Sequence, residues 1–233
     1  MILSPSSLPA RSGRGVRVAV VDSGVHADHP HVDGISGGVG VGPSGELSDD
    51  FVDRLGHGTA VAAAIREKAS MCELLAVRVF DRTLAATGVA LVRAIEWSAL
   101  QGVQIINLSL GTTNQEHAQA LTAAVADAAA RGAIVVSAAP QTDAAWLPGG
   151  LPGVVAVAVD WDCPRDECRV MVDDDGRIRV SASGYPRPIP DVPPERNFSG
   201  LSFAVANATG VLALVLEGQP VQTLAALADR LRT

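Results

Sequence analysis

The stretch "VRVAVVDSG", residues 16–24, decides the fold prediction. Its apolar, largely β-branched residues form a short continuous run that ends in Asp-Ser-Gly. Runs of this kind, bounded by turn residues, are typical of strands that are buried on both faces of a parallel sheet. We therefore expect a strand that stops at Asp22 and a turn directly after it.

Similar apolar runs recur downstream and alternate with longer, alanine-rich segments of helical spacing. The further expected strands are residues 73–80, 103–111, 133–139 and 153–160. The expected helices are residues 58–69, 87–102, 114–132, 200–216 and 223–233. Two alternating runs within residues 168–183 predict a β-hairpin with its turn at Asp174 to Gly176. This order predicts an α/β fold with a mostly parallel central sheet and helices on both faces.

Length and composition indicate one sizeable core. The chain has 233 residues, of which 48% are hydrophobic, and no segment reads as an interdomain linker. We expect an N-terminal tail over residues 1–15 and one domain over residues 16–233. The tail is expected to be disordered, with a short inhibitory segment lying across a cleft as the alternative.

Charge and hydropathy limit the partners and the location. The formal net charge is −7 and the pI is near 5.1, and no basic stripe is present, so we expect no nucleic-acid partner. No run of 18 apolar residues and no signal peptide are visible, so we expect no membrane partner and a cytoplasmic location. Cys163 and Cys168 are close enough in sequence to pair, but three reduced thiols are the favoured interpretation.

Three polar residues are expected beyond the carboxyl ends of the strands, where the functional residues of such a sheet usually lie. Asp22 ends the first strand, and His57 and Ser202 each open an apolar helix. Taken singly, they read as a turn aspartate, a structural histidine and a helix N-cap. Together they supply the carboxylate, imidazole and hydroxyl that nucleophilic acyl transfer needs.

The residues around these three positions carry a family resemblance. The motifs are D-S-G, G-H-G-T-x-V-A and S-G-x-S-F-A-x-x-x-x-x-G, in that order, with "NLSLG" at residues 107–111 between them. They resemble those of the subtilisin-like serine peptidases, or subtilases, over residues 16–216. The resemblance implies a three-layer subtilisin-like fold and a serine endopeptidase that acts on a peptide or protein substrate.

The resemblance also implies roles for matching residues. Ser202 would be the nucleophile and its backbone N–H one oxyanion donor, His57 the general base, and Asp22 the group that orients the imidazole. The segments that would bind the substrate match Ser109, Leu110 and Gly111 on the S1 side of the cleft and Leu84, Ala85 and Ala86 on the other side. No acidic residue lies in these segments, so basic residues before the cleaved bond are not expected.

The largest departure from the family pattern lies in "VVSAAPQ", where the family reads A-A-G-N and its asparagine donates the second oxyanion hydrogen bond. Pro140 stands in that place and has neither a side-chain donor nor a backbone N–H. Adjacent Gln141 is the alternative donor. The departure predicts a slow enzyme, which would suit a dedicated role in maturing a specific peptide or protein. The rival interpretation is a peptide-binding pseudoprotease with little or no turnover.

No cofactor is expected to be required, and no metal site is assigned. The aspartates at residues 173–175 offer oxygen ligands for calcium, but an acidic hairpin turn is usually solvated. The sequence "GVGPSG", residues 40–45, fits G-x-G-x-x-G, but Pro43 interrupts it and no apolar helix follows, which argues against dinucleotide binding. The sequence leaves the oligomeric state open.

Overall fold

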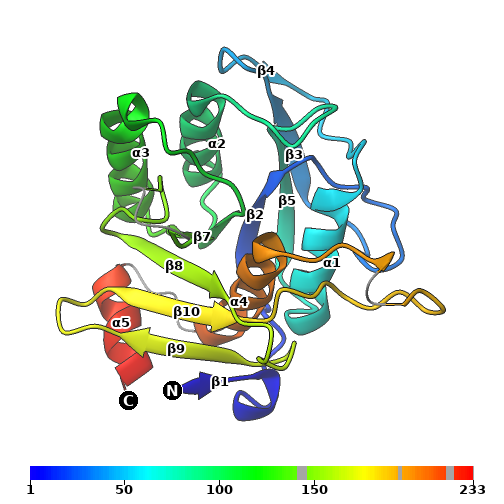
Figure 1. Cartoon of the computed structure of the whole chain (residues 1–233), viewed down its shortest axis with the longest axis vertical. Helices are drawn as coiled ribbons and strands as arrows, with labels where there is room; N and C mark the ends of the chain where they lie inside the picture. The colour runs from blue at the N-terminus through cyan, green and yellow to red at the C-terminus, as the bar shows by residue number, and fades with distance from the viewer. Residues whose placement is uncertain (141–145, 194–195, 219–222, 233) are drawn as a thin grey trace.

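A ten-stranded sheet runs through the protein in the computed structural model (Figure 1), which describes residues 1–140, 146–193, 196–218 and 223–232. The strand order is β1-β9-β10-β8-β7-β6-β2-β5-β3-β4. The strands are β1 (Ile2–Leu3), β2 (Arg17–Asp22), β3 (Gly37–Val41), β4 (Leu47–Ser48), β5 (Glu73–Arg78), β6 (Ile105–Leu108), β7 (Ile134–Ala138), β8 (Val154–Val159), β9 (Cys168–Val172) and β10 (Ile178–Ala182).

The strands from β10 to β3 in this order pair in parallel, whereas β1, β9 and β4 pair in antiparallel fashion at the two edges. The prediction of a mostly parallel α/β sheet is therefore confirmed. The register aligns Asp22 of β2 with Arg78 of β5, and Val21 with Leu108 of β6. The carboxyl ends of these strands consequently meet at one edge, where the expected site residues emerge.

Helices cover both faces of the sheet, as predicted. They are α1 (His57–Lys68), α2 (Gly88–Leu100), α3 (Ala118–Ala130), α4 (Leu201–Leu216) and α5 (Leu224–Arg232), with short 3-10 turns η1 (Pro5–Ser7) and η2 (Gln115–His117). One hydrophobic core joins α1, α4 and α5 to the sheet, and a second joins α2 and α3 to its other face. This gives the three layers of the expected architecture.

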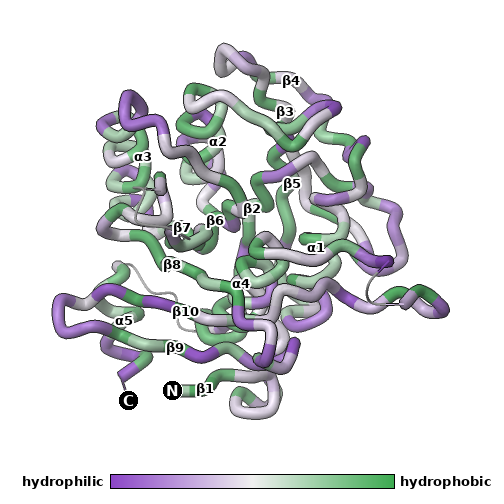
Figure 2. Tube along the Cα trace, viewed as in Figure 1, coloured by the Kyte–Doolittle hydropathy of each residue, from purple (hydrophilic) through white to green (hydrophobic). Residues whose placement is uncertain are grey.

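Helix α4 is buried from Phe203 to Leu216, because it lies between the sheet and α1. Figure 2 shows hydrophobic residues along α4 and the neighbouring strands, and hydrophilic residues at the turn between β9 and β10. Burying one leucine or valine side chain contributes about 1.5 to 3 kcal/mol. Gly210 marks the close approach of α1, since a Cβ there would lie 3.0 Å from the Cβ of Lys68 and 3.1 Å from the carbonyl oxygen of Ile65.

The predicted hairpin is confirmed. Strands β9 and β10 pair in antiparallel register, and the turn closes with a hydrogen bond from Gly176 N to the Asp173 carbonyl oxygen at 2.9 Å. The turn aspartates face arginines, since Asp173 pairs with Arg179 and Asp175 with Arg177, each at 2.9 Å. Among the described residues, no group of three or more histidines, cysteines or acidic residues is placed to hold a metal ion.

The expectation of a disordered N-terminal tail is wrong. Strand β1 pairs with β9, and Ser4 caps η1 by accepting a hydrogen bond from Ser7 N. Arg11 donates to the carbonyl oxygens of Leu214, Val215 and Glu217 at the end of α4, at 3.0 to 3.1 Å. Hydrogen bonds to a sheet edge and to a helix end therefore hold this segment, and β9, not a cleft, is where it docks.

Two further features are the state of the cysteines and the hydropathy of the helices. Cys72, Cys163 and Cys168 are all free and buried, in agreement with the interpretation as reduced thiols, and burial raises the pKa of Cys168 to about 12. Within the described ranges, no helix has the length and apolarity needed to cross a bilayer.

Candidate active site

Asp22 is the last residue of β2 and is fully buried. Its Oδ1 accepts a hydrogen bond from Ser23 N at 2.7 Å and lies 2.7 Å from Nδ1 of His57. A carboxylate only accepts hydrogen bonds, so this contact places the imidazole proton on Nδ1 and leaves Nε2 free to act as a base. The other oxygen, Oδ2, has no hydrogen-bond partner among the described residues.

His57 is the first residue of α1, and its side chain is held from several sides. The preceding Gly56 has φ 78° and supplies no side-chain cap. The ring of Phe198 lies edge-on with its centroid 5.8 Å from that of His57, and Phe203 lies at 5.4 Å. The His57 side chain is only 11% exposed, so its electrostatic environment is set mainly by the protein.

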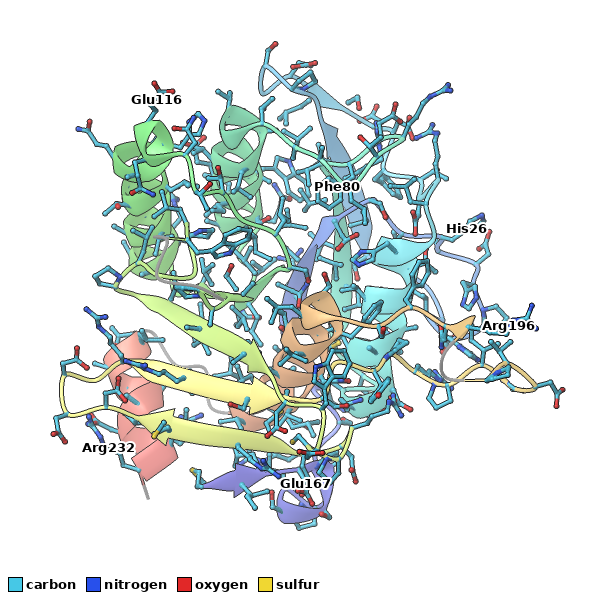
Figure 3. The ribbon with its side chains drawn as sticks, viewed as in Figure 1. His26, Phe80, Glu116, Glu167, Arg196 and Arg232 are labelled. Carbon is cyan, nitrogen blue, oxygen red and sulfur yellow. The ribbon has the colours of Figure 1, made fainter. Side chains whose placement is uncertain are left out.

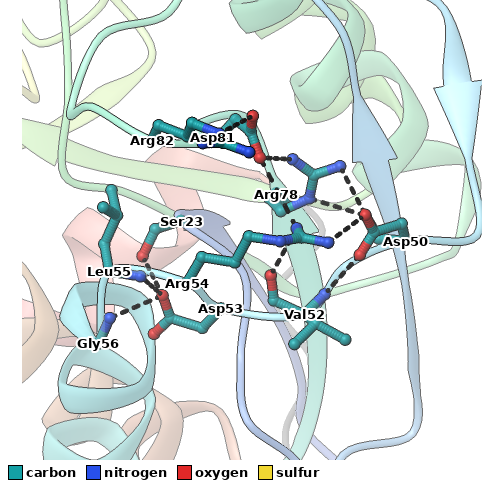
Figure 4. A network of polar contacts seen from close by, with 10 residues as sticks. All are labelled: Ser23, Asp50, Val52, Asp53, Arg54, Leu55, Gly56, Arg78, Asp81 and Arg82. Atoms are coloured by element: carbon teal, nitrogen blue, oxygen red, sulfur yellow. Dashed lines mark hydrogen bonds and ion pairs between the residues drawn. The ribbon is translucent and has the colours of Figure 1, made fainter.

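Asp53 caps the helix that carries His57. Its carboxylate accepts five hydrogen bonds, from Leu55 N, Gly56 N, the Ser23 hydroxyl, and both the backbone and the hydroxyl of Thr59, at 2.6 to 2.9 Å. Figure 4 shows Ser23, Leu55 and Gly56 converging on this carboxylate. These bonds satisfy N–H groups that otherwise lack partners at a helix start, and they fix the position of His57.

Ser23 and Asp53 are site residues that the sequence analysis missed. Ser23 donates to Asp53 and accepts a hydrogen bond from Gly58 N at 2.9 Å, so it ties the end of β2 to the start of α1. A usable signal was present, because an aspartate four residues before the helical histidine, in "DRLGHG", fits a helix N-terminus. Both are positioning residues, since they act through His57.

The pKa of His57 is raised above its ordinary value of 6.5. Burial acts in the opposite direction and favours the neutral ring. The hydrogen bond and negative charge of Asp22, with a further contribution from the charge of Asp53, outweigh burial and favour the imidazolium. The site is therefore arranged to stabilise a proton on His57.

Ser202 is the second residue of α4 and is half-buried. The start of α4 is held by a hydrogen bond from Gly200 N to the Gly184 carbonyl oxygen at 2.8 Å. The ring of Phe203, the next residue, packs on His57, so the first turns of α1 and α4 lie side by side. No hydrogen bond joins the Ser202 hydroxyl to His57 in the described part of the chain, and such contacts often tighten only when a substrate binds.

The expected substrate-binding segments lie in different environments. Ser109 follows β6, and its hydroxyl lies 3.4 Å from the Ser202 carbonyl oxygen. Gly111 faces Trp146, since a Cβ on Gly111 would lie 2.4 Å from the indole nitrogen. Leu110 between them is half-buried. The segment Leu84, Ala85 and Ala86 is exposed on the loop between β5 and α2.

Pro140 is exposed just beyond the end of β7 and, with Gly149 and Gly150, lines a cavity of about 420 Å³. Gln141, the alternative oxyanion donor, lies outside the described residues. The backbone N–H of Ser202 belongs to the first turn of α4, where N–H groups point out of the helix and favour negative charge.

The chain is similar in sequence to members of one protein family. A model of the subtilase family matches residues 13–159. A thermostable alkaline protease of Halalkalibacterium halodurans is 32% identical over 91% of this chain and 59% of its own length. An intracellular serine protease of Paenibacillus polymyxa is 30% identical over 92% of this chain and 71% of its own length.

Solved structures share the fold. Sphericase has a TM-score of 0.71 at 22% identity, covering 94% of this chain and 83% of its own. A cold-adapted subtilisin-like serine proteinase has a TM-score of 0.72 at 25% identity, covering 94% and 82%. The chain spans only about three fifths of the length of several curated relatives, namely 59% and 61% in two of them.

Proposed function

Because the chain belongs to the subtilase family, we propose that it is a serine endopeptidase whose catalytic triad is Asp22, His57 and Ser202. The observation that supports this most is the buried contact of 2.7 Å between Asp22 and His57, beside the helix start that carries Ser202. Detection of a fluorophosphonate adduct on Ser202 by intact mass and peptide mapping tests the proposal.

In the proposed mechanism, the Ser202 oxygen attacks the substrate carbonyl carbon while Nε2 of His57 takes the hydroxyl proton. Negative charge then develops on the substrate oxygen, where the N–H at the start of α4 faces it. His57 gives its proton to the leaving amine as the C–N bond breaks. Water, activated by the same imidazole, releases the acyl group, and Asp22 stabilises the imidazolium in both steps.

The pH dependence of this mechanism has a defined sign. We expect kcat/KM for a peptide to rise with pH through a midpoint above 6.5, because His57 must be neutral to act as a base and its pKa is raised by Asp22 and Asp53 against the effect of burial. Activity is thus lost as the pH falls through the raised pKa. Steady-state kinetics between about pH 5 and about pH 9 measure this midpoint, and a value at or below 6.5 would contradict the assignment.

We further propose that turnover is slow, because proline replaces the asparagine that completes the oxyanion hole in the family. In subtilisin, loss of that donor costs about 10² to 10³ in kcat. An attenuated enzyme suits the maturation of one specific peptide or protein. The competing proposal is a peptide-binding pseudoprotease, which would bind peptides without forming the fluorophosphonate adduct.

The variant Pro140→Asn is expected to raise kcat by up to about 10² and to leave KM nearly unchanged, because the new donor would meet charge that is present only in the transition state. Single-turnover kinetics on one peptide substrate separate this gain from effects on product release. The variant Gln141→Ala is the matched test of the alternative donor. If Gln141 already serves, its loss lowers kcat steeply and Pro140→Asn gains little. An active enzyme that neither substitution affects would contradict the proposal that this donor position limits turnover.

A further inference from the structure

A cavity of about 220 Å³ lies beside the first turns of α1, next to the proposed catalytic site. Gly56 and Phe198 line it, and both also flank His57, the first as its chain neighbour and the second through the ring contact of 5.8 Å. Small side chains of α1, Ala60 and Ala63, form part of the cavity wall. The cavity therefore shares walls with the catalytic imidazole.

The cavity lies on the side of the site where the leaving part of a substrate would extend. Ser109, on the acyl side, comes from β6 and contacts the Ser202 carbonyl oxygen. The cavity is formed instead by α1, by the loop that follows β2 and by the loop that precedes α4. In Figure 1, α1 lies on the opposite side of α4 from β8, which is separated from β6 in the sheet by β7 alone. If the acyl part of a peptide binds at Ser109, its leaving part would pass His57 and extend toward the cavity.

The described lining residues of the cavity include one guanidinium and one carboxylate, and the two do not form an ion pair. Arg187 lines the cavity, is half-buried, and donates to the His31 carbonyl oxygen at 3.3 Å without forming an ion pair with any described residue. Asp53 is the only carboxylate among the described lining residues, and its oxygens already accept five hydrogen bonds. A guanidinium that pairs with no described carboxylate can bind the carboxylate of a ligand through two parallel N–H groups.

Three histidines, His26, His29 and His31, line the same cavity. Figure 3 shows His26 beside the start of α1, on the side of α1 toward which the loop with Arg196 extends. The rings of His29 and His31 meet edge-on at 5.3 Å. Burial, Arg187 and His29 lower the pKa of His31, which favours its neutral form, whereas Arg187 carries a permanent charge. No trio of potential metal ligands in the described ranges is suitably placed for a metal ion.

We propose that this cavity binds an aspartate or glutamate side chain of the substrate, within the first three residues after the cleaved bond, and that Arg187 pairs with its carboxylate. The methylene groups of that side chain would pack on Phe198 and Ile189, which also line the cavity. This inference rests on the proposed endopeptidase function and names the substrate class that the site selects.

The test uses C-terminally amidated peptide libraries, so that every carboxylate after the cleaved bond belongs to a side chain. Cleavage products identified by mass spectrometry should be enriched in Asp or Glu at one of those positions. For a matched pair of peptides with Glu or Gln there, kcat/KM should favour Glu by about tenfold, as expected for one charge-assisted contact. The variant Arg187→Gln should bring the ratio close to one, and Arg187→Lys should retain part of it.

The variant Arg196→Gln is the matched control, because Arg196 is exposed on the same loop and does not line the cavity; the preference should survive it. Equal rates for the Glu and Gln peptides, or an Arg187→Gln variant that keeps the preference, would overturn the proposal. If no peptide is cleaved, fluorescence anisotropy with the labelled Glu and Gln peptides separates the two proposals. A tenfold tighter binding of Glu then supports the cavity assignment, and equal binding overturns it.

Discussion

The variant Ser202→Ala is expected to lose fluorophosphonate labelling completely and to lower kcat on a cleavable peptide by about 10⁶, because removal of the nucleophile of a serine triad leaves only binding and oxyanion stabilisation. His57→Ala should have a similar effect. The double variant should cost little more than either single one, since the two residues act as a unit. Intact mass and single-turnover kinetics on the folded proteins measure both effects.

Ser199→Ala provides the control for this experiment. Ser199 is exposed and lies just before α4, so its loss should leave labelling and turnover unchanged. A circular dichroism spectrum shows whether each variant is folded. An adduct on a serine other than Ser202 would refute the triad assignment, and a folded wild-type protein that never forms an adduct would favour the pseudoprotease.

The variant Asp22→Asn is expected to lower kcat by about 10⁴ while the fold persists. The contact of 2.7 Å between Oδ1 and the His57 ring keeps the proton on Nδ1. An asparagine amide can donate in the same place, which would turn Nδ1 into an acceptor and move the ring proton to Nε2, so that His57 could no longer take a proton from Ser202. The substitution also removes the charge that raises the pKa of His57, so that pKa should fall as burial comes to dominate.

Two measurements check this second prediction. Single-turnover kinetics give the loss in kcat, and NMR titration of the His57 ring gives the direction of the pKa change without needing turnover. Asp28→Asn is a suitable control, because Asp28 is an exposed carboxylate on the loop that follows β2. An Asp22→Asn variant with nearly unchanged kcat, or with a higher pKa at His57, would contradict the assigned role.

Much of the fold could be predicted because the parallel strands are encoded locally. The run "VRVAVVD" is apolar and β-branched, and it became a buried strand that ends at Asp22, as expected. Helix α4 was equally clear, since its apolar run is too long for a strand. The family resemblance, now supported by the subtilase match, rests on short motifs at such element ends. The roles of the individual site residues remain predictions.

Strand β3, "GGVGV", was missed because its sequence opposes its structure. Glycine is unfavourable in strands, and of these residues only Gly40 and Val41 were considered, as part of the G-x-G-x-x-G pattern at residues 40–45. Tertiary contacts require the glycines. A Cβ on Gly38 would lie 2.6 Å from the Ala76 carbonyl oxygen, and one on Gly40 would lie 2.3 Å from that of Asp50. Pairing with β5 therefore determines that these residues form a strand, and no local sequence pattern indicates that pairing.

Long-range hydrogen bonds account for the other misses. The N-terminal segment is ordered by Arg11 and by β9, which lie far apart in sequence from what they bind. The capping role of Asp53 depends on Ser23, thirty residues away. A single sequence without an alignment carries little information about such pairs.

The burial of α4 between α1 and the sheet also bears on the timing of synthesis. A ribosome makes Asp22, His57 and the parallel strands first and the helix with Ser202 much later, at about 5 to 20 residues per second. Until α4 emerges, α1 alone of the helices on that face can cover the apolar residues of the sheet, and the proposed triad lacks Ser202. The order of residues along the chain thus means that a nascent chain completes the proposed triad only when the last large helix of its core has been made.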